Sequence, residues 1–384
     1  MQTDKTSMRR TMPPLLFGFF VMGFVDLVGV ATSYVKADFN LSHSMANMLP
    51  MMVFVWFAVF SIPTGLWMGR HGRRPTVAIS LAMTAVAMLI PAVYYSLPSV
   101  MVAFALLGIG NTIMQVSLNP MVAAVVKPDK VASVLTLGQF IKAISSMLGP
   151  ILAGVVASAF GDWRLIFPVY AVASVLATVW LLLAVDADKT DDREATSIAS
   201  VWALLRRGKI FLLFCGILAA VGLDVGINTA IPKLMMERAD LPLHEAGFGT
   251  SLYFLARTAG ALAGAVILAR MSPSTFLKIT SLLALAGVSG FMFADGMWAM
   301  GALIVVIGAM WANVFSVIFS FALACAPDKS DEVSALMIMG VAGGALIPPV
   351  MGVAADAGGT VVSLIPLWIC AVYVLLLSLS HKKA

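Results

Sequence analysis

Long apolar runs alternate with short polar stretches along almost the whole chain. A helix needs about 20 apolar residues to cross the hydrocarbon core of a bilayer, and each run has that length. The pattern predicts an all-α membrane protein with twelve transmembrane helices. The predicted spans are 13–35, 45–69, 75–96, 98–126, 131–159, 164–185, 209–236, 245–270, 275–295, 297–326, 333–356 and 360–380.

Composition agrees with this pattern, because 61% of the residues are hydrophobic and only 11% are charged. A soluble domain carries about 25% charged residues to solvate its surface, so most of this surface must face lipid. The first apolar run is too long for a signal-peptide core and has no convincing cleavage site, so we expect it to remain as a span. Cys215, Cys325 and Cys370 lie in apolar runs without metal-ligand spacing and are expected to pack between helices.

The basic residues are unevenly divided between the two sets of loops. An even number of spans places both termini on one side, and 18 of the 24 Lys and Arg residues fall on that side against four on the other. Positive residues remain in the cytoplasm, so both termini are predicted to be cytoplasmic, in the inner membrane of a bacterium. The net charge of +5 therefore reflects topology, and no nucleic-acid partner is expected.

The two halves of the chain resemble each other. Val28–Lys36 aligns with Val225–Lys233 at an offset of 197 residues, and Pro128–Lys130 aligns with Pro327–Lys329 at an offset of 199. Two pseudo-symmetric six-helix bundles are therefore predicted. Parallel repeats of six helices are the signature of the major facilitator architecture, in which the substrate site lies at the bilayer midplane between the halves.

One long polar stretch, Asp186–Lys209, lies at the midpoint of the chain. We interpret it as a solvated cytoplasmic linker over 187–208, between bundles at 1–186 and 209–384. Its portion Val201–Leu205 can form a short amphipathic helix at the membrane surface.

Four ionisable side chains lie deep in predicted spans: Asp26, Lys142, Asp224 and Arg257. Each is expensive in a bilayer unless it is paired or hydrated, so each is a functional candidate. Mutual neutralisation accounts for any one of them, but less well for all four. We predict that Asp26 and Asp224 take part in proton coupling and that Arg257 has a structural or gating role.

Amide side chains form stripes at helical spacing. Asn111, Gln115 and Asn119 recur every four residues and share one helix face, and Gln139, Lys142 and Ser146 form a second stripe. Such stripes either hydrogen-bond neighbouring helices or line a cavity that binds a polyhydroxylated or charged solute. We predict the cavity, with substrate bound by Asn111, Gln115, Asn119, Gln139, Lys142, Asn228 and Asn313.

The loop after the second span reads Gly65-Leu-Trp-Met-Gly69-Arg70-His-Gly-Arg73-Arg74. It resembles the signature loop G-x-x-x-D-R-x-G-R-R of the major facilitator superfamily, with Gly69 in place of the usual acid. The resemblance implies that the three arginines bind acidic or helix-end partners in gating. They also have a plain topological role as positive residues.

Within that superfamily the chain resembles the fucose:proton symporter (sugar permease) family over essentially its whole length. Asp26 matches the family's acid in the first span, and Asn119-Pro120 comes after a position where that family has a second acid. Here that position is Gln115, so Asp26 must titrate alone, Asp224 must share the task, or coupling is lost or uses another ion. The segment Met339–Gly352 is the best match of all.

Other family positions are occupied differently. The family's Gln-x-x-Asn reads Gln139-Phe-Ile-Lys142 here, its Gly-Arg-x-x-Gly element reads Ala256-Arg257-Thr-Ala-Gly260, and Asn228 replaces an aromatic side chain that can stack on a sugar. An amide in place of an acid and a lysine in place of an amide make the cavity more positive.

A desolvated carboxylate needs a charge-assisted partner, so we predict an acidic monosaccharide, such as a sialic or uronic acid, bound by Lys142. Two alternatives remain open: a neutral hexose, with Lys142 neutralised by Asp26, and a proton-antiport exporter.

No enzyme motif is present in the sequence, and no cofactor or metal is expected. The expected partners are a small sugar and the lipid bilayer, with a proton as the coupling ion and a monomer as the working form. A membrane sensor is disfavoured, because the linker is too short to be an output domain.

Overall fold

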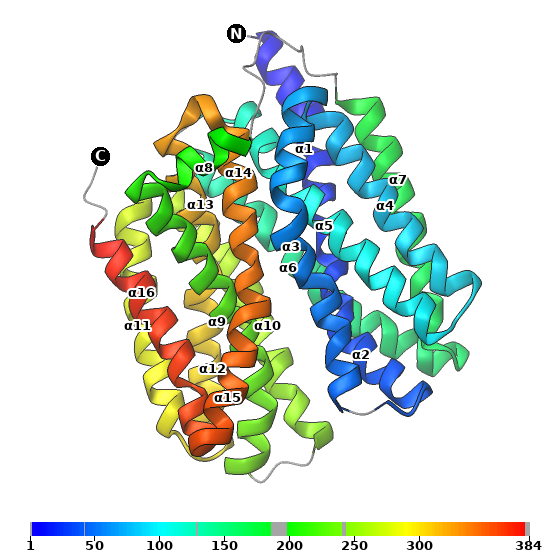
Figure 1. Ribbon diagram of the computed structural model, residues 1–384, viewed down its shortest axis with the longest axis vertical. Coiled ribbons are helices and arrows are strands. Elements are labelled where there is room, and N and C mark those ends of the chain that lie inside the picture. The colour runs from blue at the N-terminus through cyan, green and yellow to red at the C-terminus, as the bar shows by residue number, and fades with distance from the viewer. Residues whose placement is uncertain (1, 42, 128–129, 186–197, 240–242, 381–384) are drawn as a thin grey trace. The chain divides into compact units, whose positions relative to one another are not determined.

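The computed structural model describes residues 2–41, 43–127, 130–185, 198–239 and 243–380. Every regular element in these ranges is a helix (Figure 1). Twelve helical stretches are long and apolar enough to cross a membrane, and each overlaps one predicted span over most of its length. Helices satisfy their own backbone hydrogen bonds, as lipid requires. The predicted all-α architecture with twelve spans is therefore confirmed.

The chain divides into two compact units. Unit 1 comprises Met1–Pro128, Ile141–Leu204 and Asp328–Met339, and unit 2 comprises Asp129–Phe140, Leu205–Pro327 and Gly340–Ala384. Each unit corresponds to one half of the sequence except for a short segment from the other half. The predicted division at 186 and 209 did not include these two exchanged segments, and its boundaries stay a prediction. Residues 187–197 of the predicted linker lie outside the described residues.

Unit 1 is built around α5, which packs against α3 and α4, while α7 packs against α4 and α1. The late helix α14 also packs against α3 and α5. Helix α6 passes from one unit into the other. The elements are α1 (Gln2–Met22), η1 (Gly23–Asp26), α2 (Leu27–Asp38), α3 (His43–His71), α4 (Arg73–Val93), α5 (Leu97–Val125), α6 (Val131–Phe160), η3 (Trp163–Leu165), α7 (Ile166–Ala184), α8 (Ile198–Leu205), η4 (Pro327–Lys329) and α14 (Ser330–Met339).

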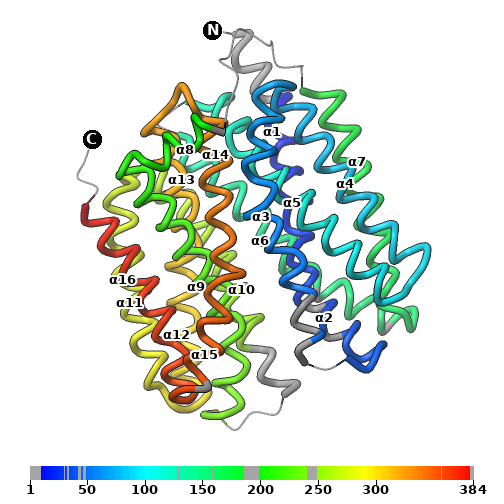
Figure 2. Tube along the Cα trace, viewed as in Figure 1, coloured from blue at the N-terminus to red at the C-terminus, as the bar shows by residue number. Residues whose placement is uncertain are grey.

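Unit 2 is built around α9, which packs against α15, α16, α10 and α13. Figure 2 shows α9 and α15 running side by side along this unit. The second layer pairs α10 with α12 and α11 with α12 and α16. The elements are α9 (Gly208–Arg238), α10 (Leu243–Leu268), α11 (Pro273–Phe293), α12 (Met297–Trp311), α13 (Val314–Cys325), η5 (Gly340–Ala342), α15 (Gly343–Ser363) and α16 (Ile365–Ser380).

Glycines allow the closest helix contacts within each unit. A Cβ on Gly108 of α5 would collide with the carbonyl oxygen of Val53 in α3, and one on Gly260 of α10 would collide with that of Ala309 in α12. Neither position has room for a side chain, so these helices approach to backbone contact. Small residues at interfaces are the common solution for packing in a bilayer, where lipid tails are as apolar as the side chains.

Several of the described spans are not continuous α-helices. The first winds as a 3₁₀ helix over η1, the tenth breaks between α12 and α13, and the eleventh passes through η5. Short 3₁₀ segments within a helix often mark hinges or functional positions. The first break ends at Asp26, the acid singled out by the sequence.

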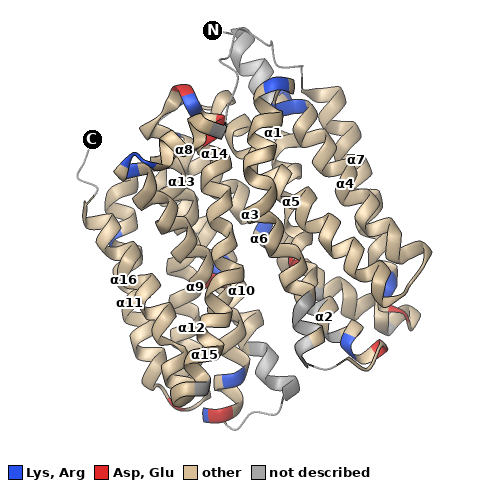
Figure 3. Cartoon of the chain, in the orientation of Figure 1, with Lys and Arg blue, Asp and Glu red and all other residues tan. Residues whose placement is uncertain are grey.

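Charged residues are sparse along the helices and concentrated near their ends (Figure 3). The predicted surface helix at Val201–Leu205 is present as part of α8. Val201 and Leu204 of this helix are buried while Trp202 is exposed, and its place at the membrane surface stays a prediction.

Candidate functional site

Asp26 lies within the first membrane span, at the end of η1 in unit 1. Its half-buried carboxylate accepts a hydrogen bond from the Ser146 hydroxyl of α6. Among the described residues no cation pairs with Asp26. This carboxyl is therefore held by a single neutral donor, in a region where charge is costly.

Lys142 lies one helical turn before Ser146 on α6 and is also half-buried. Its ammonium makes no ion pair or hydrogen bond with any residue that the structure describes. Its backbone carbonyl accepts a hydrogen bond from the Ser146 hydroxyl, which also bonds Asp26. The described residues show no ion pair between Asp26 and Lys142, which the alternative of a neutral substrate would require. Lys142 is therefore a cation in a membrane span whose electrostatic partner is not supplied by the described chain.

The three amides of α5 are deeply buried in unit 1. Gln115 Nε2 donates to Asn111 Oδ1 at 2.7 Å, and Asn111 Nδ2 donates to the Met22 carbonyl at 2.8 Å. Asn119 Nδ2 donates to the Gln115 carbonyl at 2.9 Å, and its own Oδ1 has no hydrogen-bond partner among the described residues. Asn111 is only 1% exposed, so here it acts as an interhelical donor, the alternative that the sequence left open.

Unit 2 contains a half-buried charge cluster. Arg257 Nη1 of α10 lies 2.8 Å from Asp224 Oδ2 of α9, and the Tyr253 hydroxyl donates to Asp224 Oδ1 at 2.5 Å. Asn228 Nδ2 donates to the Asp224 carbonyl at 2.8 Å. The predicted coupling acid Asp224 is thus paired with the predicted gating residue Arg257. The sequence analysis missed Tyr253, although its position four residues before Arg257 places both on one helix face.

The remaining predicted substrate residues in unit 2 differ in their surroundings. Asn313, at the break between α12 and α13, is 1% exposed and donates to the Gly260 carbonyl at 2.8 Å. It therefore connects two helix segments rather than facing an open space. Gln139 on α6 is half-buried and forms no side-chain hydrogen bond with a described residue. The amide of Gln139 remains available for a ligand.

The arginines after the second span have different partners. Arg73 is buried and donates from Nε and Nη2 to Asp331 Oδ1 at 2.9 and 2.6 Å, and from Nη2 to the Ser330 hydroxyl at 2.8 Å. Arg74 Nη2 donates to the Leu182 carbonyl, near the end of α7, at 2.5 Å. Arg70 is exposed. The loop thus ties α4 to α14 and to the end of α7 within unit 1.

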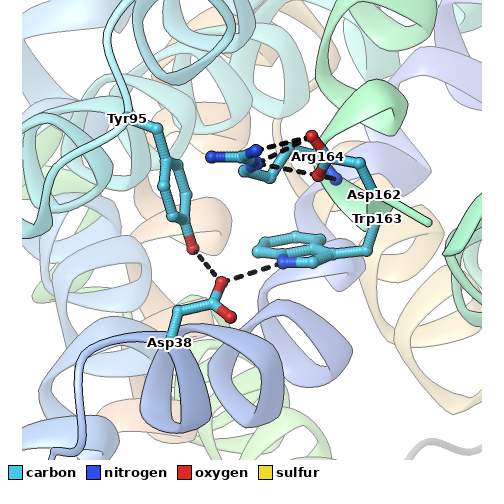
Figure 4. Close-up of polar contacts among 5 residues, drawn as sticks. All are labelled: Asp38, Tyr95, Asp162, Trp163 and Arg164. Carbon is cyan, nitrogen blue, oxygen red and sulfur yellow. Dashed lines mark hydrogen bonds and ion pairs between the residues drawn. The ribbon is translucent and has the colours of Figure 1, made fainter.

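A polar cluster that the sequence analysis did not predict lies at the other end of α4 (Figure 4). Asp38 Oδ2 accepts hydrogen bonds from the Tyr95 hydroxyl at 2.6 Å and from Trp163 Nε1 at 3.0 Å. Arg164 pairs with Asp162 at 2.7 Å and lies over the Tyr95 ring, 5.0 Å from its centroid. Burial and the Asp38 carboxylate raise the pKa of Tyr95 well above its usual range, so its hydroxyl remains a donor.

This cluster joins the end of α2, the connection between α4 and α5, and the connection between α6 and α7. These three segments are far apart in the sequence and share no motif. An acid at the end of the first span and aromatic residues in two later loops were the only signals available.

Comparisons with known proteins agree with this architecture. Residues 15–349 match the family model of the Major Facilitator Superfamily. A glucose/galactose transporter of Brucella abortus is 24% identical over 95% of this chain and 92% of its own length, and an L-fucose-proton symporter of Haemophilus influenzae is 22% identical over 88% and 87%. A crystal structure of the E. coli fucose:proton symporter matches with a TM-score of 0.84 and 15% identity, over 98% of this chain and 100% of the other.

The family match covers most of the chain, and the solved structure shares its fold from end to end. The twelve spans, the repeated halves and the arginine loop are the features that the sequence had led us to expect of such a protein. This chain therefore belongs to the Major Facilitator Superfamily of transporters.

Proposed function

We propose that this protein imports a monosaccharide together with a proton across a bacterial cytoplasmic membrane, with both of its termini in the cytoplasm. Relatives of this chain are named as transporters of glucose and galactose and as an L-fucose-proton symporter. The observation that carries the proposal is Asp26, a carboxyl in a membrane span with one hydroxyl donor and no cation partner among the described residues.

A carboxyl in such surroundings suits proton transfer. Ionised, it accepts the hydrogen bond of Ser146, and protonated it loses the cost of a charge in a bilayer. A proton taken up at Asp26 on the outer side and released inside would couple the proton gradient to substrate movement. The conformational change would be the rocking of two repeats that is typical of this architecture.

Asp26→Asn tests this role, because the amide keeps the shape of the side chain but cannot carry a proton. In proteoliposomes with an imposed proton gradient, uphill accumulation of labelled sugar should be lost while exchange of sugar across the membrane persists. Asp328→Asn is a matched control. It removes the same charge from η4, at the very start of the eleventh span. Persistent uphill uptake by Asp26→Asn would refute the coupling role.

For the substrate we propose an acidic monosaccharide whose carboxylate pairs with Lys142. The support is that Lys142 is half-buried in α6 and has no described ion-pair partner. A substrate carboxylate would supply a charge-assisted hydrogen bond to the ammonium. Gln139, on the same helix and also without a described partner, would bind a hydroxyl group in this proposal.

A neutral hexose is the second candidate, and the names of the relatives favour it. In that case the ammonium of Lys142 would bind sugar hydroxyls. Direct binding of labelled glucuronic acid, sialic acid, glucose, galactose and fucose to purified protein distinguishes the two. Lys142→Ala should abolish binding of an acidic sugar, whereas Lys142→Arg should retain part of it. Binding of neutral sugars alone would remove the acidic-sugar proposal and leave the proton-coupling proposal standing.

A further inference from the structure

The break in the first span is held by two buried amides of α5. Asn111 Nδ2 donates at 2.8 Å to the carbonyl of Met22, the residue directly before η1. Gln115 Nε2 donates at 2.7 Å to Asn111 Oδ1. Asn111 and Gln115 are 1% and 5% exposed, so water does not compete for these bonds. The three groups form one continuous chain of hydrogen bonds that ends at the backbone carbonyl directly before the 3₁₀ segment.

The direction of this chain is set by Gln115. An asparagine amide has a donor side and an acceptor side, and it can turn over to suit its partners. Because Gln115 presents its NH₂ to Asn111 Oδ1, the NH₂ of Asn111 faces the Met22 carbonyl. Reversing the polarity at position 115 would turn the Asn111 amide and place two oxygen atoms against each other at Met22.

The winding of η1 determines where Asp26 points. A 3₁₀ helix turns about 120° per residue and an α-helix about 100°, so rewinding four residues rotates the rest of the span by about 80° and changes the rise by about 2 Å. Asp26 is the last residue of η1, and its carboxylate bonds Ser146 on α6. A rotation of that size is far larger than a hydrogen bond tolerates.

Helix α6 reinforces this dependence. A Cβ on Gly23 would lie 2.6 Å from the Lys142 carbonyl, so η1 touches the backbone of α6 at the turn that carries Ser146. Other groups that contact η1 or the residue before it are the Lys142 carbonyl on α6, Tyr170 on α7, whose ring stacks on Phe24 with centroids 3.9 Å apart, and Asn111 on α5. Of these, the Asn111 side chain is the one that donates a hydrogen bond to the carbonyl directly before η1.

We propose that Asn111, oriented by Gln115, is a positioning residue that holds η1 in its 3₁₀ winding and so aims Asp26 at Ser146. The assignment rests on the proposed function for its relevance to transport. It makes the two amides determinants of the direction in which the Asp26 carboxyl points and of its hydrogen bond to Ser146, although neither touches the carboxyl. A carrier that preserves these amides would keep its pH range of uptake, and one that loses them would not.

The test monitors Asp26 directly by infrared spectroscopy of purified protein. The carbonyl stretch of protonated Asp26 is identified as the band that Asp26→Asn removes, and its intensity is measured across pH. Asn111→Leu, which keeps the size but loses both polar groups, should move the midpoint of that band by about one pH unit or more, the size expected from one altered hydrogen bond. The pH profile of sugar uptake should move with it.

Thr112→Val is the matched control. Thr112 is buried beside Asn111 on α5, but its hydroxyl bonds the Gly108 carbonyl of its own helix at 2.8 Å. Its removal should leave the Asp26 midpoint where it is in the natural protein. An unchanged midpoint in Asn111→Leu, or an equal change in Thr112→Val, would overturn the positioning role.

Gln115→Glu keeps the proposal testable if Asn111→Leu fails to fold. Protonated, Glu at this position donates to Asn111 Oδ1 as Gln115 does. At low pH the uptake of this variant should therefore match that of the natural protein. Ionised, it can only accept, so the amide turns and the uptake profile should deviate at high pH. Agreement with the natural protein at all pH values would contradict the proposal. The infrared readout needs no transport, so absence of proton-driven uptake in the natural protein would refute the proposed function alone.

Discussion

Arg73, the first residue of α4, and Asp331, in the first turn of α14, form a buried ion pair of 2.6 Å across 258 positions of sequence. Both side chains are only 8% exposed. The pair joins a segment near residue 330 to unit 1, whose other residues come from the first half of the chain, and α14 also packs against α3 and α5 there. A charged contact inside a unit depends on both partners, because removing one leaves the other buried without its ion-pair partner.

Removing one partner of this pair should therefore destabilise the protein strongly. Arg73→Met leaves the Asp331 carboxylate buried, at a cost of about 3–5 kcal/mol in the free energy of unfolding. Asp331→Leu combined with Arg73→Met should recover most of the loss, since no charge then remains. Thermal unfolding in detergent measures both variants. Additive losses in the double variant would show that the two side chains do not depend on each other.

The hydrogen bond between Tyr95 and Asp38 should contribute measurably to stability. Tyr95→Phe removes the donor and is expected to lower the free energy of unfolding by about 1 kcal/mol. Tyr94→Phe is the matched control, because Tyr94 is 70% exposed and has no described hydrogen bond. Thermal unfolding of the two variants should therefore differ. Equal unfolding temperatures for Tyr95→Phe and the natural protein would show that this hydrogen bond does not contribute to stability.

The same contact should have its own pH dependence. The pKa of Tyr95 is raised in the folded protein, so folding favours its protonated form. Its contribution is complete below the unfolded pKa of about 10 and declines as the pH rises above that value. The stability difference between the natural protein and Tyr95→Phe should stay constant up to about pH 9 and shrink above pH 10. A stability difference between the natural protein and Tyr95→Phe that grows above pH 10 would contradict this prediction.

Variants of the ion pair between Asp224 and Arg257 can distinguish a structural role of these residues from a role in proton coupling. Arg257→Gln should destabilise the protein by about 1.5–3 kcal/mol, because Asp224 would lose its ion-pair partner in a membrane span and keep the Tyr253 hydroxyl as donor. The double variant with Asp224→Asn should recover stability. If proton-driven uptake also recovers, the cluster is structural and Asp26 couples alone. Recovered stability without recovered uphill uptake would assign coupling to Asp224 as well.

Much of the fold could be predicted because the bilayer imposes a simple rule on sequence. Runs of apolar residues such as 209–236 have to be helices of a certain length, and α9 occupies that run as Gly208–Arg238. Stripes on one helix were equally predictable, since spacing sets the shared face of Asn111 and Gln115. The breaks at η1 and η5 were not predicted, because apolar pattern does not report helix winding.

The partners of the polar residues could not be predicted in the same way. Nothing in the spacing showed that Asn111 bonds the Met22 carbonyl, that Tyr253 bonds Asp224, or that Asp38 gathers two later loops. Each pairing joins residues on different helices, whose rotation and height depend on the packing of the whole unit.

The sequence by itself determined how many helices cross the membrane, where the charged and amide side chains lie along them, and which residues are expensive enough in lipid to suggest a function. These are consequences of solvation, which acts on each residue locally. The tertiary structure alone decided which of those residues neutralise one another, as Asp224 and Arg257 do, and which remain without a described partner, as Lys142 does. Ion pairs and hydrogen bonds require contact within a few ångströms, and contact is a property of the folded chain.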